Sequence, residues 1–431
     1  MTQALAVWWN NQQIGRLVIT PQRMLAFSYD GEWLQSGRAI SCSLPLEETG
    51  DFLPPDMRAH WFFANFLPEG NARDRLVRRL GVPDDDFLLL QRLGGDCAGA
   101  LSLWPEQGPV HVRDNGLRDD DLREISIADI SRAIRQGGIA SLLCNAEEGG
   151  HEDLPRLSLA GAQDKLPVRI EAAPDGPRLF MPLGNTASTH ILKLPVNDLR
   201  HVPLYECYTT FMAQQLGLPV AECVPLELDG HLCSLSTRYD REQHEGHVRR
   251  LHQEDFCQAS GRSRTAKYAD QGASLAIVAE VLRRHSSRAA ADLQQVIRWQ
   301  VFNALCGNTD GHLKNLSLLE DGDGWKLAPF YDLVCVLAIE SVSHRMALGI
   351  GGMFDSGSLM ASHWQGLAAE MGVAWRQVAS IISEMAGTLR DNHDQWHADF
   401  QSRYGEFAVL QRPHMIIRKQ VTKATSIWTG N

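Results

Sequence analysis

Short apolar runs separated by turn residues fill the first hundred positions, a pattern typical of strands joined by tight turns. Leu5–Trp9 and Ile14–Ile19 flank Asn10–Asn11, which predicts a hairpin. A third strand is expected over Met24–Tyr29. Helical spacing follows, and Gly81 is a suitable end for the second helix. This part is predicted to be a small α+β unit, with helices over Arg58–Phe66 and Asn71–Leu80.

Two polar stretches then interrupt the apolar pattern. Pro105–Asp121 contains proline, glycine and three consecutive aspartates, and Asn145–Asp153 is acidic with two glycines. Neither has an apolar period, so both are predicted to be linkers or exposed loops. Strand patterns return after the second stretch, with a hairpin across Asp229–Gly230. The predicted strands are Leu166–Ile170, Leu179–Met181, His190–Leu194, Val224–Leu228 and Leu232–Ser236.

The rest of the chain is mainly helical in pattern. A helix is expected over Tyr205–Leu216, and the strongest helical signal lies over Ala290–Cys306. One apolar stripe runs along this second helix, and Gly307 is expected to end it. The stripe consists of Leu293, Val296, Ile297, Val301, Ala304 and Leu305.

The segment after that helix carries the best candidate chemistry. Asn308–Asn315 (NTDGHLKN) is polar and should form a loop, and a strand, a turn and a second strand then lead to Asp332. Phosphoryl transfer from ATP needs one carboxylate that orients the acceptor hydroxyl, and a carboxylate and an amide oxygen that hold Mg²⁺. Asp310 precedes Asn315 by the five residues that separate the catalytic Asp and the metal-binding Asn of protein kinases.

Each of these residues also has a simpler interpretation when it is taken alone. Asp310-Gly311 could be an ordinary turn, and Asp332 could be a buried structural acid. The interpretation of Asp310 and His312 as part of a metallohydrolase site is weaker, because the sequence contains no HxH or HExxH partner. The joint pattern, with its intervening hairpin, favours phosphoryl transfer.

ATP also needs a cation for its phosphates. Lys193 is centred on an apolar strand, His190–Pro195, where a lysine is unusual unless it points to a partner. Glu206 on the following helix is the candidate ion-pair partner. A solvated edge lysine remains the alternative. The sequence has no Walker A loop and no GxGxxG, but the backbone amides of Ser158–Lys165 (SLAGAQDK) could cap phosphates.

Composition and charge narrow the class of protein. Apolar residues make up 44% and charged residues 22%, no run approaches 18 apolar residues, and no secretory signal is evident. A cytoplasmic protein with no membrane partner is expected.

The nine cysteines form no CxxC pair, which favours reduced thiols. Because the net charge is −11, DNA contact should be local or pass through a partner. The best local patch is more simply a solvated tail: Arg412, His414, Arg418, Lys419 and Lys423.

Several of these segments together resemble the HipA family of toxin kinases, over nearly the whole chain. The resemblance rests on Phe62–Gly70 (FFANFLPEG), Gly94–Gly99 (GGDCAG), Ser158–Lys165, His190–Pro195, Arg238–Arg241 (RYDR), Gln253–Gln258 (QEDFCQ), Asn308–Asn315 and Pro329–Leu333 (PFYDL). It implies an α+β, two-lobed protein-kinase-like fold with an added N-terminal α+β subdomain and a mainly helical C-terminal lobe. The expected domains are 1–110, the nucleotide-binding core 145–240 and the helical lobe 241–431.

The resemblance also assigns roles to residues. It implies that Asp310 is the catalytic base, that Lys193 binds ATP, and that Asn315 and Asp332 hold Mg²⁺. Ser158 matches the serine that family members autophosphorylate. Further residues expected at the nucleotide are Ala160, Gly161, Ala162, Gln163 and Lys165 in the loop, Thr237 and Tyr239 at the adenine hinge, and His312 near the γ-phosphate.

The family resemblance finally implies partners and a cellular role. Family members are usually encoded with HipB, a small helix-turn-helix antitoxin, and operator DNA would be bound mainly through it. The substrate would be a protein, such as an aminoacyl-tRNA synthetase. Two alternatives stay open: a kinase for a small metabolite, and a catalytically weak co-repressor that helps its antitoxin hold DNA.

Overall fold

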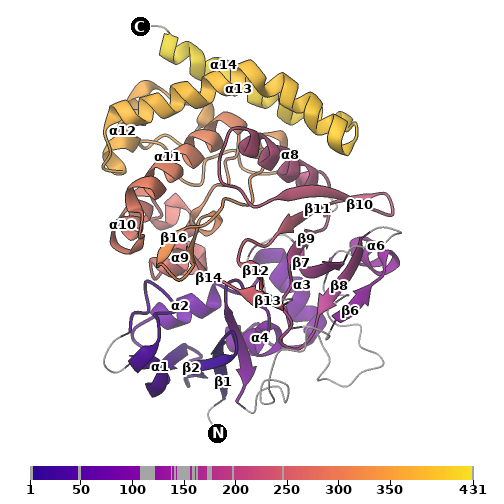
Figure 1. Ribbon diagram of the computed structural model, residues 1–431, viewed down its shortest axis with the longest axis vertical. Helices are drawn as coiled ribbons and strands as arrows, with labels where there is room; N and C mark the ends of the chain where they lie inside the picture. Colours follow the sequence, from indigo (N-terminus) through magenta and orange to yellow (C-terminus); the bar gives the residue numbers. More distant parts are fainter. Residues whose placement is uncertain are drawn as a thin grey trace. The chain divides into compact units, whose positions relative to one another are not determined.

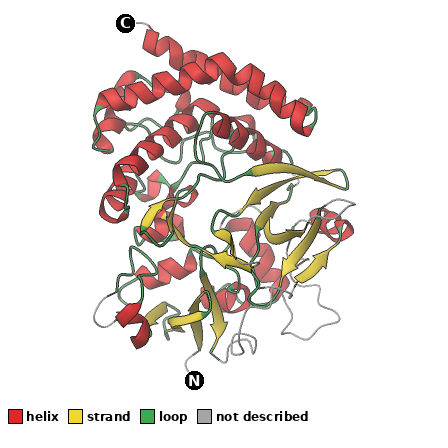
Figure 2. Ribbon diagram, viewed as in Figure 1, coloured by secondary structure: helices red, strands yellow, loops and turns green. Residues whose placement is uncertain are grey.

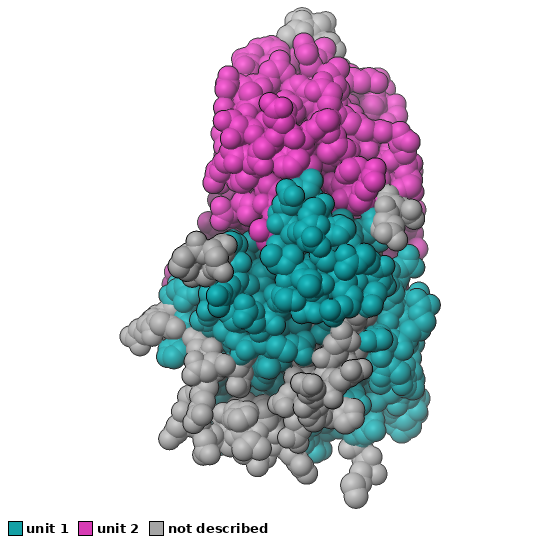
Figure 3. All heavy atoms as spheres, turned by 90° about the vertical axis from the view of Figure 1, so that its right-hand side faces the viewer, with its two compact units in different colours: residues 1–197, 227–264, 319–321 teal, residues 198–226, 265–318, 322–431 magenta. Residues whose placement is uncertain are grey.

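The computed structural model describes most of the chain, namely residues 3–46, 50–106, 122–136, 138–139, 142, 156–157, 161, 164–171, 177–196, 199–244 and 247–429. These residues form two compact units, coloured separately in Figure 3. Unit 1 comprises residues 1–197, 227–264 and 319–321, and unit 2 comprises residues 198–226, 265–318 and 322–431.

Unit 1 begins with a five-stranded antiparallel sheet of order β4-β3-β2-β1-β5. Its strands β1 and β2 are labelled in Figure 1. Its first hairpin turns at Asn10, which has a φ of 52° that asparagine tolerates better than most residues. Phe27 of the sheet and Phe63 of α2 lie in the core with ring centroids 5.3 Å apart. The elements are β1 (Ala4–Trp9), β2 (Gln12–Ile19), β3 (Leu25–Tyr29), β4 (Asp51–Phe52), β5 (Leu101–Pro105), α1 (Gly31–Ser36), α2 (Arg58–Ala64), α3 (Gly70–Leu80) and α4 (Asp86–Leu93).

A second sheet, of six strands, has the order β10-β11-β9-β7-β8-β6. Its β10–β11 hairpin turns at Asp229 and Gly230, both with positive φ, as the sequence predicts. β10 spans the boundary in the chain between the two units. The elements are β6 (Leu122–Ile125), α6 (Ile127–Arg135), β7 (Lys165–Glu171), β8 (Arg178–Pro182), β9 (His190–Lys193), β10 (Cys223–Leu228) and β11 (His231–Thr237). After them come β12 (Arg241–His244), β13 (His247–Arg250), β14 (His252–Asp255) and α9 (Phe256–Ala259).

Unit 2 is mainly helical, as Figure 2 shows. Its core helix α11 (Ala289–Cys306) buries residues on several faces, including Trp299 and Phe302. The buried polar Gln300 donates to the carbonyl of Leu348 at 2.9 Å, which compensates the loss of water. The other elements are α8 (Val202–Gln215), α10 (Leu275–His285), β16 (Trp325–Leu327), α12 (Ala361–Glu370), α13 (Trp375–Tyr404) and α14 (Gln411–Thr429). The strand β15 (Ser317–Glu320) begins in unit 2 and ends in residues assigned to unit 1. Short 3₁₀ turns occupy Arg264–Lys267, Ala269–Gln271, Leu313–Asn315, Val336–Ala338, Ser356–Ser358 and Ala408–Leu410.

The elements expected from the sequence are present within a few residues of their predicted bounds. Pro105–Asp121 lies mostly, and Asn145–Asp153 entirely, outside the described residues, so their loop character stays a prediction. The same holds for the three-domain division. The eight described cysteines form no disulfide, which agrees with the expected reduced thiols, and Cys144 lies outside the described residues. Among the described helices, none is long and apolar enough to cross a membrane.

A buried network of ion pairs joins distant segments of unit 1. Asp96, from the GGDCAG segment, lies 3.2 Å from Arg238, 2.9 Å from Arg241 and 3.3 Å from Arg250. Asp240 is 2.7 Å from Arg238 and 2.8 Å from Arg241. These five side chains are all at most 3% exposed. The network therefore anchors the backbone on which the expected adenine-hinge residues lie.

Removing one carboxylate from this network should cost much of the stability. Asp96→Asn leaves three buried guanidinium groups with one carboxylate, and a broken buried pair typically costs about 3–5 kcal/mol in free energy of unfolding. Urea denaturation should show this loss. Asp74→Asn, which alters an exposed aspartate of α3, should be close to neutral. A loss below about 1 kcal/mol for Asp96→Asn would show that the network contributes little to stability.

The same network determines how the stability of the folded protein changes with pH. Burial alone would raise the pKa of Asp240, but Arg238 and Arg241 outweigh it and lower that pKa to about 2. The pKa of Asp96 is likewise well below its ordinary value, because three arginines outweigh its burial. An aspartate in the unfolded chain has a pKa of about 3.9. The stabilisation is therefore fully present above about pH 4 and is lost as pH falls toward about 2.

Candidate active site

The loop that follows α11 presents Asp310 to solvent. Gly307 ends the helix in the left-handed conformation, with a φ of 74°, and its N–H donates to the carbonyl of Asn303. Asn308 then ties the loop to the helix. Its side-chain amide donates to Asn303 Oδ1 at 3.0 Å, and its Oδ1 accepts from the N–H of Asp310 at 3.3 Å. The backbone of Asp310 is thus held in place while its carboxylate stays exposed.

Tyr268 is a further residue of this site that the sequence did not indicate. Its hydroxyl donates to Asp310 Oδ1 at 3.2 Å, and its ring packs edge-on against the His312 ring with centroids 5.2 Å apart. Tyr268 lies about forty residues before the loop, in a segment without a recognisable motif, so only the fold reveals the contact.

His312 is a neutral side chain at physiological pH. Burial, together with the positive charges of Lys267 and Lys314, lowers its pKa to about 3. A neutral imidazole can accept a hydrogen bond at one nitrogen and donate at the other. The position expected to lie near the γ-phosphate therefore offers a hydrogen-bonding group without a charge.

Asn315 and Asp332 lie side by side at the other end of the loop. The amide of Asn315 donates to Asp332 Oδ2 at 2.9 Å, and its Oδ1 accepts from the N–H of His312 at 3.1 Å. Asp332 has a φ of 58°, an uncommon conformation for a residue other than glycine. Neighbouring Tyr331 fixes this segment, because its hydroxyl donates to the carbonyl of Lys314 at 2.7 Å.

These oxygen atoms suit a hard divalent cation. Carboxylate and amide oxygens are the protein ligands that Mg²⁺ prefers, usually one or two of them beside waters and phosphate oxygens. Asp332 supplies a carboxylate and Asn315 a carbonyl oxygen with a second lone pair. Asn315 and Asp332 would hold the ion, and Mg²⁺ would neutralise charge on the phosphates of ATP.

Unit 1 brings two predicted lysines together. Lys165 of β7 and Lys193 of β9 are directly opposite each other in the antiparallel register, so their side chains project from the same face of the sheet. Gly161 lies close to Lys165, since a Cβ added there would be 2.8 Å from Lys165 Nζ. Two ammonium groups and a close backbone approach are features that suit a polyphosphate.

The remaining predicted residues are distributed as follows. Thr237 ends β11 opposite His190 of β9, and the hydroxyl of Tyr239 donates to Gln253. Glu206 is buried in α8 of unit 2, and its pairing with Lys193 stays a prediction. Four loop residues lie outside the described residues: Ser158, Ala160, Ala162 and Gln163.

Comparisons with known proteins now identify the family. The HipA-like C-terminal domain model matches residues 157–393, more than half of the chain, and the HipA N-terminal domain model matches residues 5–104. The chain belongs to the HipA kinase family. The resemblance seen in the sequence is thereby confirmed.

Individual HipA relatives cover almost the whole chain. The Sinorhizobium fredii protein Y4mE is 36% identical over 405 residues, which cover 91% of this chain and 93% of that protein. The serine/threonine-protein kinase toxin HipA of Shewanella oneidensis is 29% identical over 375 residues, covering 84% and 81% of the two chains. A solved structure of Shewanella oneidensis HipA with HipB and operator DNA matches with a TM-score of 0.80 and 25% identity, over 98% and 99% of the chains. This match confirms the predicted α+β fold class.

Proposed function

We propose that this chain is an ATP- and Mg²⁺-dependent serine/threonine protein kinase that serves as the toxin of a HipBA-like toxin-antitoxin module. The observation that carries the proposal is the arrangement within unit 2, where Asp310, Asn315 and Asp332 gather around one short loop. The Shewanella oneidensis relative, named a serine/threonine kinase toxin, supports the same reading.

A few side chains have separate proposed roles in phosphoryl transfer. Asp310 orients the acceptor hydroxyl and receives its proton, which a carboxylate exposed at the loop surface is able to do. Asn315 and Asp332 hold Mg²⁺. Lys193 and Lys165 are proposed to neutralise the phosphates of ATP, and Thr237 and Tyr239 to meet adenine.

Tyr268 is proposed to position the catalytic carboxylate. Tyr268→Phe removes the hydroxyl that donates to Asp310 and keeps the ring that packs on His312. A hydrogen bond to a charged group contributes about 1.5–3 kcal/mol, and partial exposure reduces this, so kcat should fall about threefold to tenfold with KM for ATP unchanged. Steady-state phosphorylation assays measure both values. An unchanged kcat would exclude a positioning role for Tyr268.

DNA binding is proposed to pass through an antitoxin. The net charge of −11 opposes broad contact with phosphates, and the related Shewanella oneidensis structure contains HipB and operator DNA. The isolated chain should therefore cause no sequence-specific gel shift of its operator at about 0.15 M salt, where the Debye length is about 8 Å. Addition of a HipB-like antitoxin should restore the shift. Nanomolar, specific binding by the chain alone would contradict the proposal.

Autophosphorylation at Ser158 is proposed as an off-switch. A phosphate on this serine adds about −1.5 to −2 charge to a loop that also carries Gly161 and Lys165. That charge would compete with ATP for the same cations and repel its phosphates. Calorimetry on fully phosphorylated and unphosphorylated protein should give a weaker ATP affinity for the former. If phosphorylated protein, unphosphorylated protein and Ser158→Ala all bind ATP with the same affinity, phosphorylation of Ser158 is not an off-switch.

The acceptor is proposed to be a component of translation, such as an aminoacyl-tRNA synthetase. A metabolite kinase would use the same ATP site, and a co-repressor would need no catalysis. Phosphoproteomics after brief induction of the wild type and of Asp310→Asn separates the three. A phosphoserine or phosphothreonine found only with the wild type supports the protein kinase. Growth arrest by both the wild type and Asp310→Asn would favour the co-repressor. Growth arrest by the wild type alone, without new phosphosites on proteins, would favour the metabolite kinase.

A further inference from the structure

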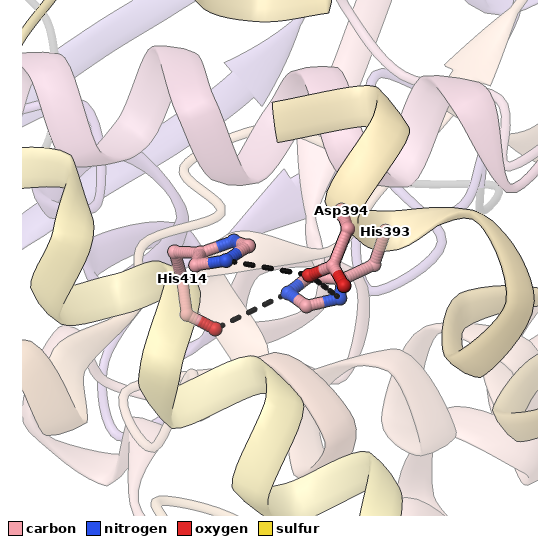
Figure 4. Close-up of side chains that lie close together, drawn as sticks. All are labelled: His393, Asp394 and His414. Carbon is pink, nitrogen blue, oxygen red and sulfur yellow. Dashed lines mark hydrogen bonds and ion pairs between the residues drawn. The ribbon is translucent and has the colours of Figure 1, made fainter. Parts of the chain in front are cut away.

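A group of histidines lies where α13 meets α14. His393 and Asp394 are neighbours on α13, and His397 follows one helical turn later. His414 belongs to the first turn of α14. Figure 4 shows the Asp394 carboxylate beside the His393 ring, with dashed lines that join it to His393 and to His414. His393 and His414 are buried, whereas the Asp394 side chain is 68% exposed, so the group opens to solvent through one residue.

Two of the three spacings between potential ligand atoms in this group match a metal coordination shell. Asp394 Oδ1 lies 3.3 Å from His393 Nδ1 and 3.4 Å from His414 Nε2. In a tetrahedral site with metal–ligand bonds of about 2.0–2.1 Å, neighbouring ligand atoms are about 3.3–3.4 Å apart. One potential ligand atom from each of the three residues falls within 4.8 Å of the others. The two imidazole rings are stacked, with centroids 4.4 Å apart and 17° between their planes, so one ring must rotate for both nitrogen lone pairs to face a single ion.

The hydrogen bonds around His393 leave a lone pair facing that carboxylate. Its Nε2 lies 3.2 Å from the carbonyl oxygen of His414, which can only accept, so this nitrogen carries the hydrogen. A neutral imidazole carries one ring hydrogen, so Nδ1 then has a lone pair, and this nitrogen lies 3.3 Å from Asp394 Oδ1. Two acceptors that face each other at this distance repel, and a cation between them converts the repulsion into binding.

The same bond also supplies the outer support that metal-binding histidines need. Such a histidine usually donates its second N–H to a carbonyl or carboxylate, which fixes the ring and its tautomer. His393 does so through the carbonyl of His414. His414 has Tyr208 Oη 3.5 Å from its Nδ1, and a hydroxyl oxygen can accept there while Nε2 faces Asp394.

His397 is excluded from the ligand set by its own hydrogen bonds. Its Nδ1 lies 3.0 Å from Tyr208 Oη, and its Nε2 lies 2.9 Å from the Gln401 amide. Gln401 is oriented by the N–H of Phe407, which donates to its Oε1 at 2.9 Å, so the amide nitrogen faces the ring. Both nitrogens of His397 are therefore engaged, and three protein ligands remain.

We propose that His393, Asp394 and His414 form a binding site for a divalent transition-metal ion of the Zn²⁺ class, with water in the open position. Two imidazoles and one carboxylate favour Zn²⁺, Co²⁺ or Ni²⁺ over Mg²⁺ or Ca²⁺, which prefer oxygen ligands. Because the ligands come from α13 and α14, the ion clamps the two helices together. This site is distinct from the proposed Mg²⁺ site at Asn315 and Asp332 and does not depend on kinase activity.

Zinc titration of the full chain, freed of metal with a chelator, tests the site. Asp394→Ala removes the exposed ligand with little risk to folding, and Asp399→Ala alters another exposed aspartate of α13 as the matched control. Calorimetry should show one Zn²⁺ bound by the wild type and by Asp399→Ala, and affinity at least tenfold lower for Asp394→Ala. Saturating Zn²⁺ should raise Tm of the wild type and of Asp399→Ala, and should not raise Tm of Asp394→Ala.

Cobalt distinguishes this site from adventitious binding at cysteines. Co²⁺ bound to imidazole and carboxylate gives visible d–d bands without the intense near-ultraviolet charge-transfer band of a thiolate ligand. The wild type should show the former spectrum, and Asp394→Ala should lose it. Absence of stoichiometric binding by the wild type, a thiolate spectrum, or equal Zn²⁺ affinity and Tm shift in Asp394→Ala would each overturn the proposal.

Discussion

Asp310→Asn is expected to lower the rate of phosphoryl transfer by about 10²- to 10⁴-fold, the usual contribution of a positioned general base. An amide can still accept the hydrogen bond from Tyr268, so the loop should keep its conformation. It cannot take the proton of the acceptor hydroxyl. The loss should therefore appear in kcat, with ATP affinity nearly unchanged. Single-turnover incorporation of labelled γ-phosphate measures the rate.

The control for this variant is Asp399→Asn, which makes the same chemical change on the exposed face of α13. Its rate should match the wild type. A rate for Asp310→Asn within about threefold of the wild-type rate would contradict the expected loss. It would show that the carboxylate neither orients nor deprotonates the acceptor hydroxyl.

Asp332→Asn is expected to abolish the Mg²⁺-dependent part of ATP binding. The substitution removes one anionic ligand while leaving shape and volume almost unchanged. Asparagine is the informative choice because Asp332 has a φ of 58°, a region that asparagine tolerates. Alanine there would add roughly 1–2 kcal/mol of backbone strain. A weaker ATP affinity of that variant could then come either from the missing ligand or from the lower stability. Calorimetric titration with ATP, with and without Mg²⁺, gives the comparison.

The expected pattern for Asp332→Asn is an ATP affinity that no longer responds to Mg²⁺, together with a cooperative unfolding transition close to that of the wild type. If the variant binds Mg²⁺-ATP as tightly as the wild type, Asp332 is not a metal ligand. If it unfolds without cooperativity, its hydrogen bond with Asn315 matters chiefly for the fold.

Much of the fold could be predicted from local sequence signals. The β1–β2 and β10–β11 hairpins turn where Asn10 and Asp229-Gly230 predict them, since these residues accept positive φ. α11 ends at Gly307 for the same reason. Such features depend on a few adjacent residues, so one sequence is enough to find them. The α13–α14 pair was expected only as a helical region, because its bounds depend on packing rather than on strong caps.

The candidate site was predictable only where its chemistry follows the order of the chain. Asp310, Asn315 and Asp332 lie within one loop and the hairpin after it, so their spacing could be compared with that of kinases. The contact of Tyr268 with Asp310 and the register of Lys165 against Lys193 depend on the tertiary fold. No local pattern encodes contacts of this kind.

One expectation about the C-terminus is corrected by the structure. The basic residues there were expected to form a solvated tail. Four of the five lie exposed on α14, as expected, namely Arg412, Arg418, Lys419 and Lys423, but His414 is buried. The sequence pattern of α14 shows its charges but not which face packs on α13. His414 is therefore part of the histidine group and not of a basic surface.

The most direct test of kinase activity is the mass of the full chain after incubation with ATP and Mg²⁺. We expect that the wild type gains the mass of a phosphoryl group on serine, that a chelator prevents the gain, and that Asp310→Asn remains unmodified over the same period. If the wild type gains no phosphate on itself or on any protein of a cell extract, the kinase assignment is contradicted. The same holds if Asp310→Asn is modified as fast as the wild type.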